Sequence, residues 1–218
     1  MRKQYLVVAA GLSLGLLFII ATHVYQTQQS QKLDFLARED AEIFVRPHSP
    51  TLGNPDARVT LVEFMDPACE TCAAFSPFVK KLMDDNPGKI RLVLRYAPFH
   101  DGAEDFVRIL EAAGNQDKYW ETLDIMYKSQ GHWASHQNPQ PHLLWDFVAM
   151  AGVDLETIRS DMNEARIQRI LEQDIADARA LNVTKTPGFF VNGKPLTTFG
   201  FKQLQQLVES EIARHYPQ

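Results

Sequence analysis

The chain has 218 residues, of which 45% are apolar and 22% are charged. This balance is typical of a globular domain, and the length is sufficient to bury an apolar core without several disulfides. The formal net charge is −5 and no stretch is rich in lysine and arginine, which argues against a nucleic-acid partner because phosphate binding requires clustered cations.

The N-terminal segment differs in composition from the rest of the chain. Arg2 and Lys3 precede a nearly uninterrupted apolar run over residues 5–21, at about the minimum length for a membrane-spanning helix. No clear cleavage site follows, so residues 1–25 are interpreted as a signal anchor, with a cleaved signal peptide as the alternative. The positive end predicts that the remainder lies outside the cytoplasm, on the periplasmic side of an inner membrane.

Residues 26–50 have the composition of a linker, since they begin with Gln, Thr and Ser and end with Pro47 and Pro50. The folded domain is predicted to occupy residues 51–218. Within it, residues 58–65 and 90–96 are short and rich in β-branched or aromatic residues, which predicts two buried strands. Apolar residues at helical spacing connect them from Cys69 to about residue 86.

Residues 102–180 form a block of helical patterns, interrupted near residues 138–141 and at Gly152. Residues 188–191 and 194–198 are then predicted to be strands joined by the Asn192-Gly193 turn, because this dipeptide is a strong hairpin signal. A helix over residues 201–215 follows.

This order of elements predicts an α/β fold. A strand–helix–strand unit with short connections gives parallel strands, and the hairpin adds antiparallel ones. We therefore expect a mixed sheet flanked by helices, with an inserted all-helical subdomain over about 102–180 and an N-terminal membrane helix before it.

The two cysteines are spaced as Cys69-Glu70-Thr71-Cys72. A structural zinc site would need a further pair of ligands at matching spacing, which the sequence lacks. A purely structural disulfide across so short a loop would constrain the unfolded chain very little. A redox-active pair explains the spacing best, because residues i and i+3 at a helix start face the same side.

The position of the pair suggests how its chemistry works. The unpaired amides and the dipole at a helix N-terminus stabilise a thiolate, so we expect Cys69 to be an exposed nucleophile of lowered pKa. Cys72, one turn further and more buried, is expected to be the resolving cysteine. No cofactor beyond this pair is predicted.

The region around the cysteines resembles the active site of the thioredoxin superfamily. The matching features are Val62-Glu63-Phe64 at a strand end, the Cys69–Cys72 motif and Pro77 five residues later. The long helical insertion and the late Thr186-Pro187 resemble the DsbA-type branch of thiol–disulfide oxidoreductases. The resemblance covers roughly residues 51–215.

The resemblance implies roles for three further residues. Glu63 would be a buried acid beneath the cysteines that relays the proton of Cys72, and a dry site would raise its pKa; the alternative is a solvated strand charge. Thr186 and Pro187 would face the cysteines through a cis peptide bond and pair with the substrate chain. The partners would be cysteine-containing exported polypeptides and a membrane redox partner.

Two departures from the family pattern leave the direction of electron flow open. Glu70 beside Cys69 should disfavour the thiolate, which predicts a less oxidising couple than that of the strongest DsbA-type oxidases. Thr186 before Pro187 is more similar to the reductase and isomerase branches. A reductase or isomerase of the same fold is therefore the alternative, followed by a Cu(I)-binding carrier. The substrates and the oligomeric state are left open.

Overall fold

The structure is a computed structural model that describes residues 13–25, 27–28, 41–134 and 140–217. It divides into two units, residues 1–43 and 44–218. In the first unit, residues 13–25 are helical and η1 (Ala41–Ile43) is a short 3-10 helix. None of the helices in the described ranges is both long and apolar enough to cross a bilayer. Residues 1–12 of the predicted anchor lie outside the described residues.

The second unit contains a five-stranded sheet with strand order β1-β3-β2-β4-β5. Its centre is the parallel pair β2 (Val59–Met65) and β3 (Ile90–Tyr96), as predicted. The hairpin of β4 (Gly188–Val191) and β5 (Lys194–Pro195) lies antiparallel beside β2, which confirms the mixed sheet.

Two details of the sheet differ from the sequence prediction. β1 (Thr51–Gly53) pairs antiparallel with β3 and was not predicted, because three residues are too short to show a period. β5 ends at Pro195 rather than residue 198. The predicted turn is present, with Asn192 and Gly193 both at positive φ, as a tight hairpin requires.

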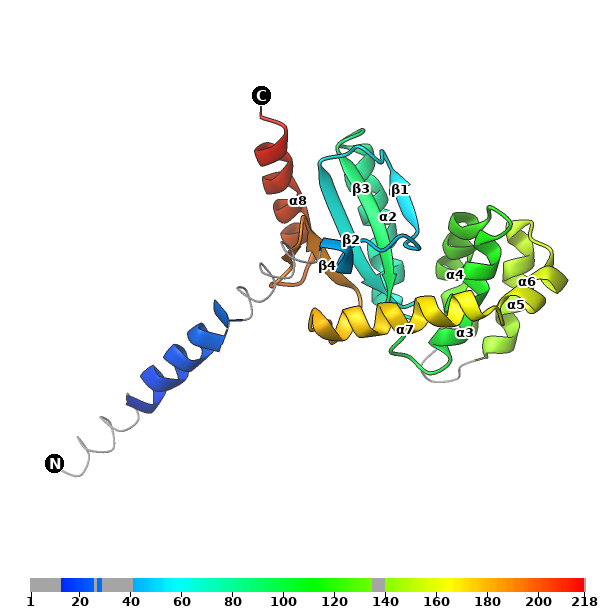
Figure 1. Ribbon diagram of the computed structural model, residues 1–218, viewed down its shortest axis with the longest axis horizontal. Coiled ribbons are helices and arrows are strands. Elements are labelled where there is room, and N and C mark those ends of the chain that lie inside the picture. The colour runs from blue at the N-terminus through cyan, green and yellow to red at the C-terminus, as the bar shows by residue number, and fades with distance from the viewer. Residues whose placement is uncertain (1–12, 26, 29–40, 135–139, 218) are drawn as a thin grey trace. The chain divides into compact units, whose positions relative to one another are not determined.

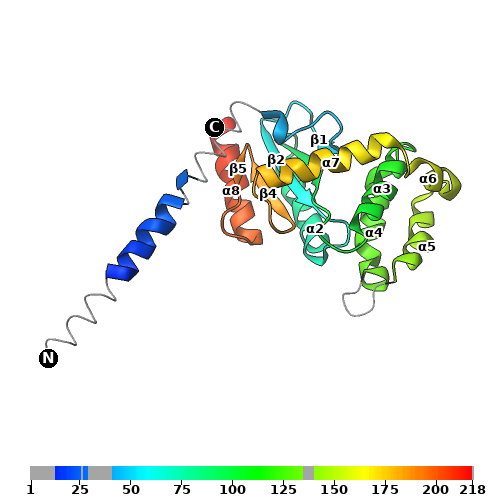
Figure 2. The same ribbon diagram turned by 60° about the horizontal axis from the view of Figure 1, so that its bottom comes forward.

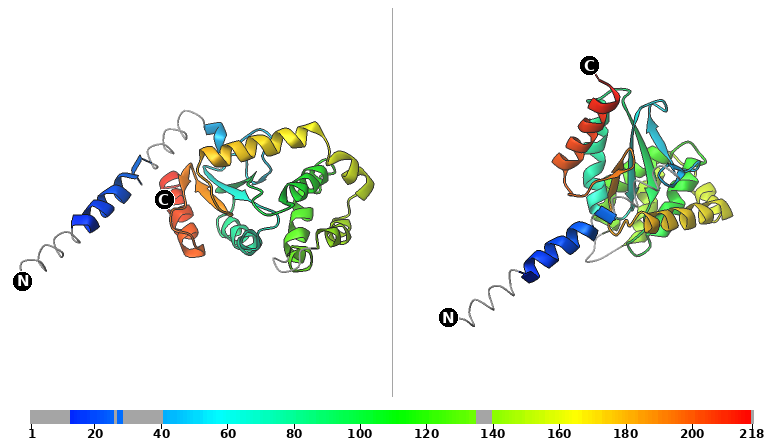
Figure 3. Two further views of the ribbon diagram at one scale, coloured as in Figure 1. Left: turned by 90° about the horizontal axis from the view of Figure 1, so that it is seen from below. Right: turned by 60° about the vertical axis from the view of Figure 1, so that its left-hand side comes forward.

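Helices cover both faces of the sheet (Figures 2 and 3). α2 (Glu70–Asp84) and α8 (Phe201–His215) lie on one face, where α8 contacts β2 and β4. α7 (Ala165–Ala180) crosses the other face and contacts β3. Both central strands are therefore buried on both sides, which explains their almost continuous apolar sequences.

The helical insertion lies beside the sheet (Figure 1). Its elements before α7 are α3 (Ala103–Gly114), α4 (Tyr119–Trp133), η2 (Pro141–Leu143), α5 (Leu144–Val148), η3 (Ala149–Ala151) and α6 (Leu155–Asp161). Trp133 is completely buried there and packs edge-on against Phe106, with 4.6 Å between the ring centroids, as expected of a core aromatic.

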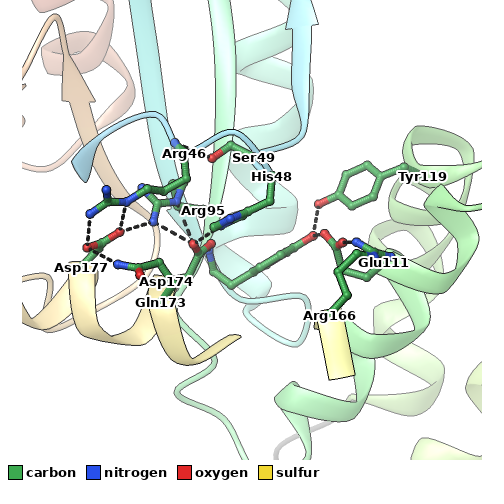
Figure 4. A network of polar contacts seen from close by, with 11 residues as sticks. Arg46, His48, Ser49, Arg95, Glu111, Tyr119, Arg166, Gln173, Asp174 and Asp177 are labelled. Atoms are coloured by element: carbon green, nitrogen blue, oxygen red, sulfur yellow. Dashed lines mark hydrogen bonds and ion pairs between the residues drawn. The ribbon is translucent and has the colours of Figure 1, made fainter. Parts of the chain in front are cut away.

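A buried ionic network joins α7 to the sheet (Figure 4). Arg95 of β3 is fully buried and contacts Asp174 at 2.7 Å and Asp177 at 2.6 Å. Arg46 donates to Asp177 at 2.8 Å, and His48 lies 2.7 Å from Asp174. Such buried charges are tolerated because each has a close partner of opposite charge.

This network corrects the predicted end of the linker at residue 50. Residues 44–50 belong to the folded unit, since Arg46 and His48 join the network and Phe44 packs against Phe190 at 5.2 Å. Their polar and proline-rich sequence resembles a linker because the partners lie far away in the chain.

Candidate active site

The cysteine pair lies where β2 ends and α2 begins. After Met65, the turn through Asp66 and Ala68 leads to Cys69, which is the N-cap residue of α2 with extended backbone angles. The sulfur of Cys69 accepts a hydrogen bond from the amide of Cys72 at 3.4 Å. Both cysteines are free thiols. The sulfur of residue 69 thus occupies the position where a helix satisfies its first unpaired amides.

Cys69 was predicted to be exposed, and the structure shows that it is almost completely buried. Only 5% of Cys69 is exposed, and Cys72 is completely buried. The loop before β4 contributes to this cover, since the Cys69 thiol donates to the carbonyl oxygen of Thr186 at 3.4 Å. Cys69 remains the more accessible member of the pair, which agrees with its predicted role as nucleophile.

The two thiols differ strongly in acidity. A hydrogen bond from the side chain of Cys72 lowers the pKa of Cys69 from 9.0 to about 5, against the opposing effect of burial, and contacts with Thr186 and the amides of Thr71 and Cys72 assist. Burial raises the pKa of Cys72 far above its ordinary range, helped by Cys69 and Glu63. At neutral pH the pair therefore holds one thiolate and one thiol.

Glu63 is buried in the central strand, with 4% of its surface exposed, rather than solvated. It faces α2, because it lines the same cavity as Ser76, Val79 and Lys80. Burial raises the pKa of this carboxyl from 4.5 to about 8, and the charge of Cys69 adds to the effect. A carboxyl with this pKa can accept and return a proton near neutral pH.

The cavity beside Glu63 is narrow. Its volume is about 20 Å³, and Trp120, Tyr127 and the surface ion pair Lys80–Asp124 also line it. This volume is enough for about one water molecule. Glu63 thus has room for a hydrogen-bonded water beside it.

The bond between Thr186 and Pro187 is cis, and the carbonyl of Thr186 lies against the Cys69 sulfur. The fold thus brings together four of the five predicted site residues, Glu63, Cys69, Cys72 and Thr186, with Pro187 bonded to the last. Their catalytic and substrate-binding roles remain predictions.

The structure adds Asp66, which the sequence analysis did not single out. Its carboxylate is completely buried and accepts hydrogen bonds from the amides of Ala68 at 2.8 Å, Phe99 at 2.7 Å and His100 at 2.9 Å. The His100 ring nitrogen Nδ1 also lies 2.8 Å from it. An acid at a strand end, three residues before the first cysteine of a C-x-x-C motif, was the available signal.

His100 is linked to the cysteine turn through this carboxylate. Among the described residues, no group of three or more His, Cys, Asp or Glu side chains is arranged to hold a metal ion. The Cu(I) alternative would therefore depend on the two cysteine sulfurs.

Comparison with known proteins gives a family for this fold and site. The family model described as Thioredoxin matches residues 46–210. The "Probable disulfide bond formation protein D" of Bacillus anthracis is 26% identical over 231 aligned positions, which cover 98% of this chain and all of that protein. The "Na(+)/H(+) antiporter NhaA" of Herminiimonas arsenicoxydans is 33% identical over 144 residues. The matching part of this chain spans only 22% of that antiporter.

Solved structures show the same fold. A thioredoxin-like oxidoreductase from Silicibacter pomeroyi has a TM-score of 0.69 at 29% identity, with 81% of this chain and 98% of that chain covered. BdbD from Bacillus subtilis in its oxidised form has a TM-score of 0.66 at 24% identity, with 76% and 93% covered.

Proposed function

Since this chain belongs to the thioredoxin family, in its DsbA-type branch of thiol–disulfide oxidoreductases, we propose that it oxidises cysteine-containing polypeptides through Cys69 and Cys72. The observation that carries this proposal is the stabilised Cys69 thiolate, with a pKa of about 5, at the N-cap of α2. A thiolate of this stability is a good leaving group, so the oxidised pair readily gives up its disulfide to another thiol.

The reaction follows from the geometry. In the oxidised protein, a substrate thiolate attacks the Cys69 sulfur, a mixed disulfide forms and the Cys72 sulfur leaves. Glu63, whose pKa of about 8 keeps it protonated at neutral pH, supplies the proton that Cys72 takes up. A second substrate thiolate then attacks the substrate sulfur and releases Cys69 as the thiolate. The substrate gains one disulfide, and the two electrons that it loses reduce the disulfide between Cys69 and Cys72.

The substrate backbone is placed by Thr186 and Pro187 in this proposal. Their peptide bond lies against the Cys69 sulfur, so a chain joined to Cys69 runs past this segment. Glu70 beside Cys69 is exposed, and its negative charge makes the couple less oxidising than that of the strongest oxidases of this branch. A reduction potential equal to theirs would refute that expectation.

We place the domain outside the cytoplasm, anchored in the inner membrane by residues 1–25 and re-oxidised by a membrane redox partner. The support is the basic N-terminus followed by an apolar run. Cell fractionation would test this placement: the full chain should sediment with membranes, and a version lacking residues 1–25 but given a cleavable export signal should be soluble in the periplasm.

Peptide oxidation tests the reaction itself. The oxidised protein should convert a reduced two-cysteine peptide to its disulfide with release of its own dithiol. Cys69→Ser and Cys72→Ser should both abolish this reaction, because neither variant can form the disulfide that oxidises the peptide. When the same peptide is supplied as its disulfide, the thiolate of Cys69 in Cys72→Ser should attack it and accumulate a mixed disulfide, because the resolving thiol is missing. Retention of full activity by Cys69→Ser would contradict the mechanism.

A further inference from the structure

A second surface feature adjoins the cysteines and is not used by the mechanism above. It is a groove of about 410 Å³ whose lining begins at Ala68, the residue before Cys69, and extends over the start of α3. We call it the acidic groove. The lining residues that matter here are Ala68, Phe99, His100, Asp101, Asp105 and Phe106.

Among the described lining residues of the acidic groove, the exposed charged side chains are all acidic. Asp101 and Asp105 are exposed, and neither forms an ion pair with any described residue. No lysine or arginine is among the described lining residues. Glu70, the residue after Cys69, is exposed and adds negative charge near the same sulfur. The start of α3 favours Asp105 through the helix dipole, but Asp101 precedes the helix and gains less from it.

The groove also offers apolar surface. Phe99 is 49% exposed, whereas Phe106 is 6% exposed and rests on the buried Trp133. An exposed aromatic ring in the same groove as two carboxylates suits a long side chain with an apolar stem and a cationic head, since the stem can lie along the ring while the head reaches the acids.

The groove is connected to the cysteine turn through Asp66. One side of this carboxylate accepts from the amide of Ala68, and the other accepts from Phe99 and His100 on the groove wall. The carbonyl of Asp66 accepts from the amide of Cys69. The groove wall and the nucleophile are therefore held by one buried residue, so a chain in the groove lies at a defined position relative to Cys69.

We propose that the acidic groove binds a lysine or arginine of the substrate polypeptide, close in sequence to the cysteine that Cys69 attacks. This inference rests on the proposed function and adds a substrate preference to it. Because two carboxylates at a solvent-accessible site interact only modestly with a cation, the preference is expected to be roughly tenfold and to weaken with salt.

The test uses reduced two-cysteine peptides that differ at one position beside the first cysteine, which is Lys, Gln or Glu. Each oxidation rate by the wild-type protein is divided by the rate of the same peptide with oxidised glutathione, to remove the effect of the neighbour on the peptide thiol itself. The normalised rates should follow the order Lys, Gln, Glu. In Asp101→Asn/Asp105→Asn the three rates should become nearly equal.

A matched control is Asp56→Asn/Glu209→Gln, which removes two exposed acids far from Cys69 in the chain and changes the net charge equally. It should keep the wild-type order of peptides. Wild-type oxidation of all three peptides at equal normalised rates would overturn the inference while leaving the proposed function intact. If the wild-type protein oxidised none of the three peptides, both the inferred preference and the proposed function would be overturned.

Discussion

The sulfur of Cys69 lies 3.4 Å from the carbonyl oxygen of Thr186, although 117 positions separate the two residues. The contact joins the helix that carries the cysteines to the loop that precedes β4. A substrate bound to Cys69 must therefore share the surroundings of that sulfur with residues 186 and 187. This arrangement reduces the exposure of Cys69 and also contributes to the lowered pKa of its thiol.

The side chain at position 72 should control the acidity of Cys69. Cys72→Ala removes the hydrogen-bond donor that contributes most to lowering the pKa of Cys69 from 9.0 to about 5, so this pKa should rise. Cys72→Ser retains a donor and should change it less. The ultraviolet absorbance of the thiolate across a pH titration measures both variants. Equal pKa values in the two variants would show that the helix N-terminus alone sets the acidity.

Glu63→Gln should alter how stability depends on pH. The pKa of Glu63 is raised from 4.5 in the unfolded chain to about 8 in the folded protein, so the unfolded state ionises first and stability is lost as pH rises between these values. Relative to the wild type, the variant should gain stability over this window, by an amount on the order of 5 kcal/mol.

The effect of Glu63 must be measured as the difference in unfolding free energy between the variant and the wild type. Cys69 titrates in an overlapping pH range and changes the stability in the opposite direction. Its folded pKa of about 5 lies below the unfolded value of 9.0, so it stabilises the reduced protein as pH rises. Urea unfolding of the reduced wild type and Glu63→Gln at several pH values separates the two effects. If the free energies of unfolding of the two proteins changed with pH in parallel, burial would not disfavour the ionised form of Glu63.

Asp66→Asn should destabilise the protein by about 1–3 kcal/mol, because the amide nitrogen of asparagine cannot accept and leaves a buried N–H group without a partner. His100→Asn removes only the imidazole contact and should cost less. Asp56→Asn, at an exposed position, is the matched surface control. Chemical denaturation of the three variants gives the comparison, and equal losses in Asp66→Asn and Asp56→Asn would rule out the role assigned to Asp66.

Arg95→Met should be the most damaging change in the ionic network. It leaves Asp174 and Asp177 buried without their central cation, and loss of one partner from a buried ion pair costs roughly 3–5 kcal/mol. A second change, Asp174→Asn, should recover part of the loss in unfolding experiments, because it removes one of the unpaired charges. No recovery would indicate that the contact of the Arg95 guanidinium with the Phe64 ring, at 5.3 Å from its centroid, matters more than the two ion pairs.

Local sequence patterns were sufficient for most elements. The strand pair β2 and β3, the hairpin at Asn192-Gly193 and the helix over residues 201–215 each depend on propensities and periodicity within a few neighbouring residues. The C-x-x-C spacing at the start of a helix likewise has its chemical meaning within one turn. The sequence alone therefore determined the order of most elements, the class of fold and the pair of reactive thiols.

Tertiary structure alone decided what surrounds that pair. The small exposure of Cys69, the pKa of Glu63, the contacts of Asp66 with Phe99 and His100 and the inclusion of residues 44–50 all arise from segments distant in sequence. The physical reason is that desolvation and long-range hydrogen bonds depend on which surfaces meet after folding, and no local pattern records the partner.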